Sequence, residues 1–384
     1  MKKKILFVSH DASRTGAPIV FKYLIQWVKN TTTFDFLILF KNTDGQKGAI
    51  IDDFSNLGNT LTWPQNSHKK TFFGKIWKKL TFKPLKLIPT VIKNSKFDLI
   101  YLNTVDSVYL LPALKTFHQC PVILHVHEGE WAINSFFAET LDSNHTQYID
   151  RYIAVSESTK KNLIENFSIP AEKIVLINEF VPVKMIPAPT GQLNVIQTKL
   201  KSAGDFIVGG SGTADWRKGI DLFIQVAAIV KRTGKKVKFI WVGSVDNHVQ
   251  HQLNYELKRM ALTDADILFT GSVSNPQDYF SMFDIFVLTS REDPFPLVCL
   301  EAAGLGKPVI CFADAGGMPE MVSNGGGIIV PYINTQAMAQ AIISLKDDPE
   351  KLNRLSAEAK TVVQEYDVSV QAPKIIEVIN TLIN

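Results

Sequence analysis

Three carboxylates stand in an otherwise apolar stretch, SREDPFPLVCLEAAG, residues 290–304. Seven residues separate two of them, Asp293 and Glu301. The run before them predicts a strand and LVCLEAAG predicts a helix, so Asp293 follows the strand and Glu301 lies inside the helix. A carboxylate can accept hydrogen bonds from two sugar hydroxyls, and a helix N-terminus favours a phosphate. The pattern indicates a sugar-phosphate or nucleotide site. The alternative is that Asp293 caps the helix and Glu301 faces solvent.

The elements that must position these residues alternate along the whole chain. Short runs rich in Val, Ile and Leu, typical of buried parallel strands, are separated by segments of helical periodicity. Strands are expected in the first half at 4–9, 34–40, 98–103, 122–127, 152–156 and 174–178, and in the second half at 206–210, 238–243, 267–271, 285–290, 308–312 and 326–331.

A proline-interrupted stretch at 179–192 separates the two halves and reads as a linker. The sequence therefore predicts an α/β protein of two tandem Rossmann-like, doubly wound domains that face each other across a cleft. The expected domains are 1–182 and 183–367, followed by a terminal helix at 368–384.

Composition limits the setting of the protein. The three cysteines, Cys120, Cys299 and Cys311, form neither a disulfide framework nor a metal-binding spacing, which indicates a reducing, cytoplasmic location. The apolar run near the N-terminus is about five residues, shorter than a signal peptide requires. No run approaches the roughly 18 apolar residues of a membrane span, so we expect a soluble protein.

A basic patch breaks the otherwise even charge pattern. Between Ser67 and Phe97 the chain carries nine lysines and no Asp or Glu, although the net charge is only +4. Aromatic side chains lie among these lysines, which is typical of a segment that contacts an anionic membrane. The residues expected to make this contact, or to bind the acceptor, are Lys75, Trp77, Lys78 and Lys79. In the alternative, the lysines of this 69–96 patch are merely solvated. No nucleic-acid motif accompanies the patch, which disfavours RNA as the partner.

Four further motifs accompany the two carboxylates in the second half. They are GSGTADWRKGIDLF (210–223), FIWVGS (239–244), ILFTGSVSNPQDYFSMFDIFVLTS (267–290) and AGGMPEMV (315–322). Together they resemble the nucleotide-sugar-binding half of the GT-B glycosyltransferases, closest to the retaining GT4 family, also called group 1. The first half resembles this family more loosely, through SRTGAP (13–18), HVHE (125–128), YIAVSESTKKNL (152–163) and KIVLINEFV (173–181).

The resemblance implies roles for individual residues. Glu301 matches the acid that grips the ribose hydroxyls, and Asp293 matches the acid that faces the transferred sugar. Lys218 matches the lysine on the donor diphosphate, with Arg217 beside it. His127 matches a histidine near the reacting centre, with His125 as an alternative.

Further donor-binding positions follow from the same resemblance. They are Gly16 in the first strand–helix loop, Gly212, Ser244, and the backbone N–H groups of Phe295 and Leu297. Gly212 stands where the family usually has an arginine, so either Arg217 compensates for it or the site holds the phosphate more weakly. The resemblance also implies that the terminal helix at 368–384 packs back on the first domain.

Other polar residues near these motifs have ordinary explanations as well. His125 and His127 alternate along a strand and so point the same way, yet no third ligand has a metal spacing. Glu128 fits a surface loop. Glu320 fits either a contact to the donor sugar or an ordinary helix start.

The combined interpretation is a retaining glycosyltransferase that moves a sugar from a UDP- or GDP-linked donor to a saccharide or lipid-linked acceptor. It would need no metal and no cofactor, and it would work in the cytoplasm, at the inner face of the cell membrane. Two alternatives stay open. One is a non-catalytic glycosyltransferase-like binding subunit, and the other is a nucleotide-sugar epimerase of the same fold.

Overall fold

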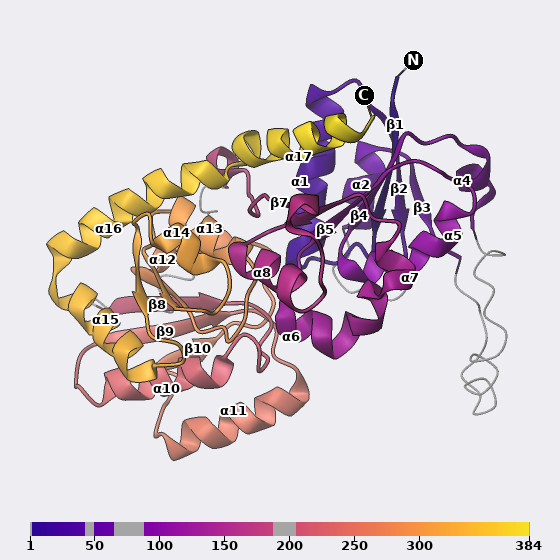
Figure 1. Cartoon of the computed structure of the whole chain (residues 1–384). Coiled ribbons are helices and arrows are strands. Elements are labelled where there is room, and N and C mark those ends of the chain that lie inside the picture. The colour runs from indigo at the N-terminus through magenta and orange to yellow at the C-terminus, as the bar shows by residue number, and fades with distance from the viewer. Residues whose placement is uncertain (1, 43–49, 65–87, 187–204, 384) are drawn as a thin grey trace, which may run out of the picture. The chain divides into compact units, whose positions relative to one another are not determined.

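The computed structural model describes residues 2–42, 50–64, 88–186 and 205–383. The chain divides into two compact units (Figure 1). Unit 1 comprises 1–155, 159–177 and 372–384, and unit 2 comprises 156–158 and 178–371. Each unit is built on a parallel sheet of its own.

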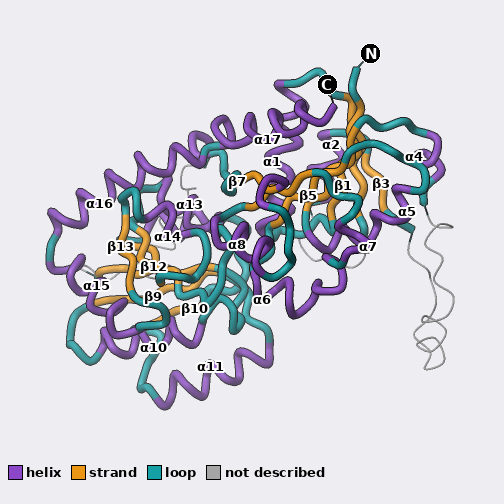
Figure 2. The backbone as a smooth tube through the Cα atoms, viewed as in Figure 1, coloured by secondary structure: helices purple, strands orange, loops and turns teal. Residues whose placement is uncertain are grey.

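The sheet of unit 1 has seven strands in the order β3-β2-β1-β4-β5-β6-β7, all parallel. Helices alternate with these strands along the chain (Figure 2). The strands are β1 (Lys4–Ser9), β2 (Asp35–Phe40), β3 (Thr60–Thr62), β4 (Leu99–Asn103), β5 (Val122–Val126), β6 (Arg151–Ala154) and β7 (Ile174–Leu176). The α-helices are α1 (Gly16–Thr31), α2 (Ile51–Leu57), α4 (Thr90–Asn94), α5 (Leu111–Lys115), α6 (Glu130–Ala132), α7 (Ser143–Thr146) and α8 (Glu157–Glu165). Tighter turns form the 3₁₀ segments η2 (Val105–Leu110), η4 (Ala138–Leu141) and η5 (Ala171–Lys173), and η3 (Ile133–Phe137) is a π-helix.

The sheet of unit 2 has six parallel strands in the order β10-β9-β8-β11-β12-β13. This is the strand order of a dinucleotide-binding Rossmann sheet. The strands are β8 (Phe206–Ser211), β9 (Val237–Val242), β10 (Ile267–Phe269), β11 (Ile285–Leu288), β12 (Val309–Phe312) and β13 (Gly327–Val330). The helical segments are η6 (Val183–Met185), α10 (Ile220–Lys231), α11 (Asn247–Arg259), α12 (Pro276–Met282), α13 (Leu297–Gly304), α14 (Met318–Val322), α15 (Thr335–Asp347), α16 (Pro349–Val362), η7 (Val363–Tyr366) and α17 (Val368–Ile383).

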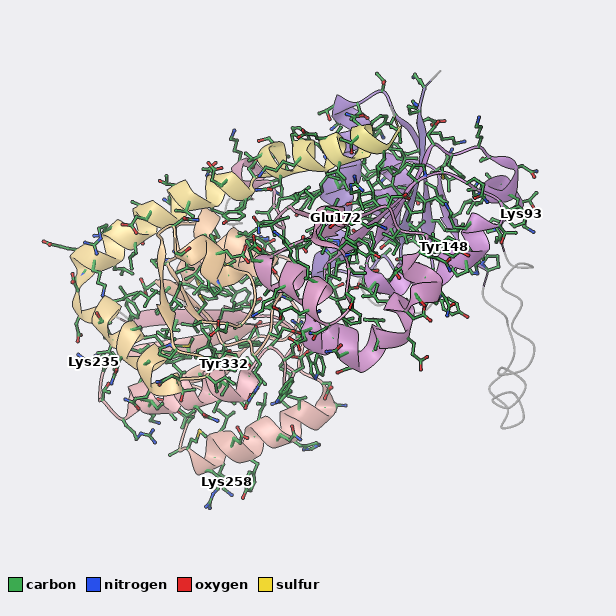
Figure 3. The ribbon with its side chains drawn as sticks, in the orientation of Figure 1. Lys93, Tyr148, Glu172, Lys235, Lys258 and Tyr332 are labelled. Atoms are coloured by element: carbon green, nitrogen blue, oxygen red, sulfur yellow. The ribbon has the colours of Figure 1, made fainter. Side chains whose placement is uncertain are left out.

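Burial explains why these segments form their elements. Strands such as β4 and β5 are buried on both faces, as parallel strands covered by helices must be. Helix α1 buries Phe21, Leu24, Ile25 and Val28, which lie on one face at helical spacing. Side chains fill the space between sheets and helices, whereas charged residues such as Lys258 on α11 point away from the ribbon (Figure 3).

The terminal helix α17 belongs to both units. Its residues up to 371 group with unit 2, and those from 372 onward group with unit 1. There the end of the helix lies beside the start of β1 (Figure 1), and the Lys3 ammonium donates a hydrogen bond to the carbonyl of Ile383.

The predicted α/β class with two parallel sheets is confirmed, and each of the twelve expected strands is present. The short strand β3 was not predicted. The chain passes between the units at 177–178, whereas the sequence placed the boundary at 182–183. The acceptor-side and donor-side roles of the two domains stay predictions.

Candidate functional site

A carboxylate at the carboxyl end of β11 forms the centre of the unit 2 cluster. Asp293 is buried, with 6% of its surface exposed. Helix α13 begins after Pro296, and no side chain caps it. The alternative that Asp293 is a helix cap is therefore wrong, and its burial needs another explanation.

Two cations supply that explanation. The Lys218 ammonium pairs with Oδ2 of Asp293, and Nη1 of Arg217 lies 3.5 Å from Oδ1. The Ser290 hydroxyl donates to Oδ2 at 3.2 Å. Burial alone would raise the pKa of Asp293, but the two positive charges and these hydrogen bonds outweigh it and lower the pKa. The carboxylate is therefore ionised at neutral pH and holds both cations.

The lysine reaches Asp293 by passing over a glycine. Gly212 follows β8 with a φ of +142°, and a Cβ at this position would lie 3.1 Å from Cε of Lys218. A side chain here would be strained and would press on the lysine. Gly212 thus leaves room for Lys218, and Arg217 brings a second positive charge to the cluster.

The loop after β12 closes on the loop after β11. The N–H of Asp293 donates to the carbonyl of Ala315 at 2.7 Å, and the N–H of Gly317 donates to that of Pro294 at 2.9 Å. A Cβ on Gly316 would lie only 1.9 Å from the Asp293 carbonyl oxygen. Only glycine permits this approach, so the AGGMPEMV motif positions the backbone around Asp293.

Glu301 lies just over one turn into α13 and is partly buried. Burial raises its pKa to about 7, and a hydrogen bond with Gln277 acts in the opposite direction. A partly buried carboxylate that is costly to ionise is a candidate for binding a ligand. This burial disfavours the alternative that Glu301 is simply solvated.

A stacked arginine braces the loop that carries the cations. Arg291 pairs with both carboxylate oxygens of Asp221, at 2.8 and 2.6 Å, and its guanidinium lies 5.0 Å from the centre of the Trp216 ring. Its N–H donates to the carbonyl of Arg217 at 2.8 Å. These contacts fix the turn from Trp216 to Lys218.

The other residues predicted for this site are placed as follows. Phe295 is buried, with its ring 5.2 Å from that of Tyr366, and Leu297 is the first residue of α13. Ser244 is exposed, and its carbonyl accepts from the N–H of Ala214 at 2.8 Å.

Glu320 uses its carboxylate within the protein. One oxygen accepts from the Glu157 N–H at 2.7 Å, and the other accepts from the Asn178 amide at 3.3 Å. The structure thus gives Glu320 a bracing role.

In unit 1 a histidine pair lies at the carboxyl end of β5. The rings of His125 and His127 are 4.0 Å apart, so the prediction that they point the same way is confirmed. His125 is buried, and its Nδ1 shares a hydrogen bond with the Tyr101 hydroxyl oxygen, 2.7 Å away. His127 is partly exposed, and its Nε2 lies 2.9 Å from Oδ1 of Asn103. Of the two, His127 is the one that can meet a ligand.

Glu128 belongs to the same cluster and is no ordinary surface residue. Its two oxygens accept from the N–H groups of Val105 and His127, each at 3.1 Å. Burial raises its pKa to about 7, whereas the charge of His127 and these N–H donors act in the opposite direction.

Thr104, next to Asn103, has a φ of 121° and a ψ of 151°, a backbone conformation that residues other than glycine rarely adopt. Such strain costs about 1–3 kcal/mol and occurs most often at functional sites.

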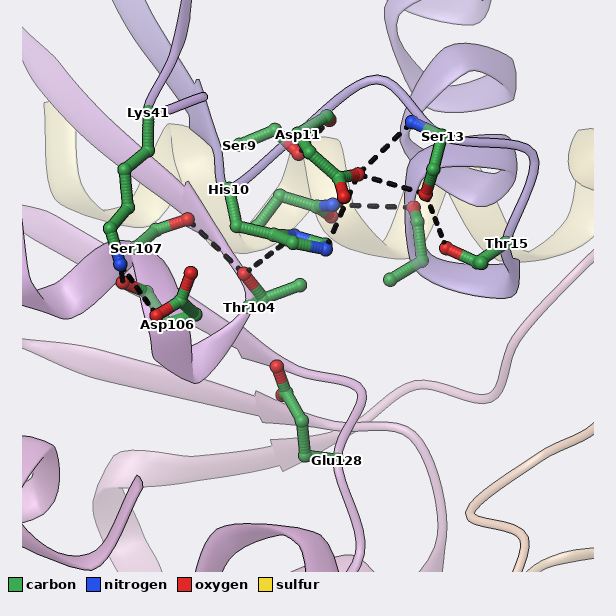
Figure 4. Close-up of polar contacts among 12 residues, drawn as sticks. Ser9, His10, Asp11, Ser13, Thr15, Lys41, Thr104, Asp106, Ser107 and Glu128 are labelled. Atoms are coloured by element: carbon green, nitrogen blue, oxygen red, sulfur yellow. Dashed lines mark hydrogen bonds and ion pairs between the residues drawn. The ribbon is translucent and has the colours of Figure 1, made fainter. Parts of the chain in front are cut away.

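The loops after β1 and β2 complete this cluster (Figure 4). Nδ1 of His10 lies 3.1 Å from the Thr104 hydroxyl, and Lys41 pairs with Asp106 at 2.6 Å. Burial lowers the pKa of His10, while the charge of Asp11 acts in the opposite direction. The cluster thus combines hydrogen-bonding side chains with the carboxylates of Asp11 and Glu128 and with one lysine–aspartate pair.

Gly16 is the first residue of α1 and is exposed, with open space where a side chain would begin. It therefore leaves the start of α1 open to a ligand. Lys75, Trp77, Lys78 and Lys79, predicted for the acceptor and membrane patch, lie outside the described residues.

Within the described ranges, no group of three or more His, Cys, Asp or Glu side chains is arranged to hold a metal ion. Among those same residues, no helix combines the length and apolar character needed to cross a membrane. Two open grooves of about 460 and 440 Å³ flank α17, and none of their lining residues belongs to either polar cluster.

Sequence reasoning missed Asn103, Thr104, His10 and Ser290. Each follows or ends a buried strand at the point where the strand order reverses, between β1 and β4 or between β8 and β11. Ligands of doubly wound sheets bind at this point. Polar residues directly after a buried strand were the signal available for finding them.

Family models match both halves of the chain. The model described as Glycosyl transferases group 1 matches residues 194–362, and the model described as Glycosyltransferase Family 4 matches residues 52–184.

Curated proteins are similar to this chain over different lengths. An alpha-galactosylglucosyldiacylglycerol synthase of Streptococcus pneumoniae is 26% identical over 295 residues, which cover 73% of this chain and 76% of the relative. The lipopolysaccharide core biosynthesis glycosyltransferase LpsD of Rhizobium meliloti is 31% identical over 172 residues, 44% of this chain and 47% of the relative. The chain thus spans less than half the length of this second relative.

Solved structures share the fold over nearly the whole chain. The HepE protein of Anabaena in complex with UDP and glucose superposes with a TM-score of 0.82 at 20% identity, covering 99% of this chain and 100% of that one. A sucrose-phosphate synthase of Thermosynechococcus elongatus superposes with a TM-score of 0.79 at 19% identity, covering 99% of each chain.

Proposed function

Since the chain belongs to the group 1, GT4-type glycosyltransferases, we propose that it transfers a sugar from a nucleoside-diphosphate sugar with retention of anomeric configuration. The acceptor in this proposal is a saccharide or a lipid-linked saccharide. The similarity to curated transferases of glycolipid and lipopolysaccharide synthesis supports a role in glycan or glycolipid biosynthesis.

The observation that carries the proposal is the pair of cations on Asp293. Lys218 and Arg217 converge on one buried carboxylate at the carboxyl end of β11. A diphosphate leaving group develops negative charge as the glycosidic bond breaks, and fixed cations stabilise that charge. In the proposed reaction Lys218 exchanges Asp293 for the diphosphate, and Arg217 adds a planar guanidinium suited to phosphate oxygens.

Asp293 and Glu301 take the sugar ends of the donor. Released from Lys218, the Asp293 carboxylate can accept hydrogen bonds from hydroxyls of the transferred sugar. Glu301 accepts hydrogen bonds from the ribose hydroxyls. These hydroxyls supply the hydrogen bonds that water would give to a fully exposed carboxylate. The HepE structure with UDP and glucose supports a uridine donor as the first choice, with a GDP-linked donor as the alternative.

Retention follows in this proposal from departure of the diphosphate and attack by the acceptor from the same face. The reaction then needs no protein nucleophile, because the leaving group is stabilised by Lys218, Arg217 and backbone N–H groups. These cations also supply the charge that a metal ion would otherwise provide, so we propose a metal-independent reaction without a cofactor.

The proposed location is the cytoplasmic face of the cell membrane. The diacylglycerol relative supports a lipid-linked acceptor, and the lysine-rich 69–96 patch supports contact with anionic lipid. Sedimentation with vesicles tests this part. Binding to anionic vesicles that salt reverses is expected, and equal binding to neutral vesicles would contradict it.

The test of the proposed function is a transfer assay with UDP-glucose, UDP-galactose and GDP-mannose against free and diacylglycerol-linked hexoses. We expect nucleoside diphosphate release that depends on acceptor, and a product whose anomeric proton shows the donor's configuration by NMR. Conversion of the donor without acceptor would favour the epimerase alternative. Absence of turnover together with tight donor binding would favour the non-catalytic subunit.

A further inference from the structure

Two aromatic side chains of unit 1 are exposed on the short helices that follow β5. Trp131 on α6 has 39% of its surface exposed, and Phe136 on η3 has 65%. Their ring centres are 5.3 Å apart, and the ring planes stand at 89° to each other. Aromatic side chains usually contribute to a protein by burying their large apolar surface, so an exposed pair in contact indicates a binding surface.

The core of unit 1 holds this pair in place. Ile133 is fully buried, and its N–H donates to the carbonyl of Gly129 at 3.0 Å, which closes the turn that carries Trp131. Phe137 packs against the same core, and its ring lies 6.2 Å from that of Phe136. The segment η3 is a π-helix, a rare conformation that is frequent at functional sites. Phe136 is thus presented to solvent from an anchored turn.

The pair begins where the histidine cluster of unit 1 ends. Trp131 lies three residues after Glu128, whose two oxygens accept from the N–H groups of Val105 and His127. The loop that fixes this carboxylate therefore continues directly into the turn that carries the exposed rings. Aromatic faces combined with a few fixed polar groups are typical of sites for small polar ligands.

The charge of the surrounding segment limits what the rings can bind. Residues 116–150 include no Lys or Arg. The acidic residues of this segment are Glu128, Glu130, Glu139, Asp142 and Asp150. A phosphate or an anionic lipid headgroup would meet no cation here, in contrast to the lysine-rich 69–96 patch. A pyranose is uncharged and presents C–H groups on a face of its ring, which can pack on an aromatic face.

We propose that Trp131 and Phe136 form an aromatic platform that binds an uncharged pyranose ring of the acceptor. The proposal deepens the function proposed above and rests on it for the role of this ring in transfer. Binding of a neutral pyranoside to the platform requires no donor and no turnover. Failure of the platform and failure of the proposed function are therefore distinguishable.

Saturation-transfer NMR of the whole chain without donor tests the platform directly. The probes are methyl α-glucoside, methyl α-galactoside and the anionic glucose-6-phosphate, each at millimolar concentration. We expect saturation of the protein's aromatic protons to reach the ring protons of at least one methyl glycoside, and this transfer to fall at least about threefold in Phe136→Ala. No transfer to either glycoside in the wild type, or an equally strong signal from glucose-6-phosphate, would overturn the proposal.

Phe117→Ala is the matched control for this experiment. Phe117 is another exposed phenylalanine of unit 1, with 41% of its surface exposed, and it lies outside the platform. We expect Phe117→Ala to retain the wild-type signal. Equal signals in Phe136→Ala and Phe117→Ala would contradict the assignment of the pyranose to the platform.

Two other occupants of the platform give different results. Dihexanoylglycerol, which is uncharged and carries no sugar, tests for an acyl chain, and sedimentation velocity over a range of protein concentrations tests for a second copy of the chain. A dihexanoylglycerol signal that Phe136→Ala removes would assign the rings to lipid. Self-association that the same substitution removes would assign them to a subunit interface. Each of these results would overturn the proposal, and we expect neither.

The transfer assay tests the role of the bound ring. In Trp131→Ala and in Phe136→Ala we expect the acceptor KM to rise at least about threefold with the donor KM unchanged, because the platform contacts the acceptor alone. Phe136→Ala should melt close to the wild type, since most of this side chain is exposed. A raised donor KM with an unchanged acceptor KM would contradict the proposal. If the wild type transfers no sugar, the proposed function fails, and the saturation-transfer result still decides whether the platform binds a pyranose.

Discussion

The two units place polar clusters at the same point of the same strand order, but they build them from different chemistry. In unit 2 the cluster between β8 and β11 consists of full charges, with Lys218 and Arg217 on the Asp293 carboxylate. In unit 1 the cluster between β1 and β4 is centred on side-chain hydrogen bonds, such as Asn103 with His127 and Thr104 with His10, and one lysine–aspartate pair lies beside them.

This difference shows that the fold selects the location of a site, and the side chains select its ligand. A buried ion pair is costly to desolvate but can be exchanged for another anion, such as a diphosphate. Neutral donors and acceptors at fixed positions suit the hydroxyls of a sugar. In the proposed reaction, the cluster of unit 2 would bind the charged end of the donor and the cluster of unit 1 would bind hydroxyl groups.

The largest expected effect comes from removing the exchangeable cation in Lys218→Ala. We expect kcat to fall about 10²–10³-fold, which is the usual effect of deleting one group that stabilises developing charge. The melting temperature should fall as well, because Asp293 loses its main partner. Lys235→Ala is the control, since Lys235 forms an exposed pair with Asp347 at 2.6 Å and such pairs contribute little. Equal losses in the two variants would show that Lys218 has no larger role than a lysine in an exposed ion pair.

Asp293→Asn tests whether the carboxylate competes with the diphosphate for Lys218. Because the substituted amide carries no charge to compete for Lys218, we expect UDP or GDP to bind about tenfold more tightly. This tenfold change corresponds to a gain in binding free energy of roughly 1.4 kcal/mol. Transfer should nevertheless decline, because the contact with the transferred sugar is lost. Calorimetric titration measures the first effect and the transfer assay measures the second. Weaker nucleotide binding in this variant would show that Lys218 does not exchange partners.

The pH dependence of donor binding provides a sharper comparison. Burial raises the pKa of Glu301 to about 7, so the ionised form that accepts ribose hydroxyls is lost as pH falls through 7. We expect the affinity for UDP-glucose to fall about tenfold between pH 8 and pH 6. UDP-glucose is the suitable probe, because its diphosphate is a diester and does not titrate in this range. A flat profile would exclude Glu301 as an ionised donor ligand.

The same shift has a consequence for the unliganded protein. The folded-state pKa of Glu301 lies above its ordinary value of 4.5, so its ionisation opposes folding as pH rises from about 4.5 to 7. Glu301→Gln should therefore raise the melting temperature at pH 8 while it weakens nucleotide binding. A residue that binds ligand but lowers the stability of the folded protein produces these two opposite effects, a higher melting temperature and weaker binding when it is replaced.

The smallest expected effect concerns Arg291, whose contacts fix the turn from Trp216 to Lys218. Arg291→Lys keeps the positive charge but loses the paired contact with Asp221 and the stacking on Trp216. We expect donor KM to rise roughly threefold, with kcat nearly unchanged, because the loop positions Lys218 less firmly. An unchanged KM would show that the turn is held by its backbone alone.

Much of the fold was predictable because buried parallel strands have a strong sequence signal. Continuous apolar runs such as Ile5 to Val8 and Ile285 to Leu288 mark their strands without any knowledge of partners. Strand β3 was missed because three partly exposed residues, Thr60–Thr62, carry no such signal.

The candidate site was predictable only residue by residue. Motif resemblance placed Lys218 and Asp293 in one site, but the ion pair between them joins positions 75 residues apart. Spacing alone cannot show which contacts form over such a distance. Asn103 was missed for the same reason, since its partner His127 lies on the next strand, and the strain at Thr104 exists only in the folded backbone.

The central claim is that unit 2 binds a nucleoside diphosphate through Glu301 and the cation pair. Thermal unfolding of the wild type and of Glu301→Gln with UDP, GDP, ADP, TDP and CMP tests it most directly. At 100 times its dissociation constant, one diphosphate should stabilise the wild type by about 2.7 kcal/mol, and Glu301→Gln should lose most of this shift. No shift with any nucleotide at millimolar concentration, or an equal shift in both proteins, would contradict the account.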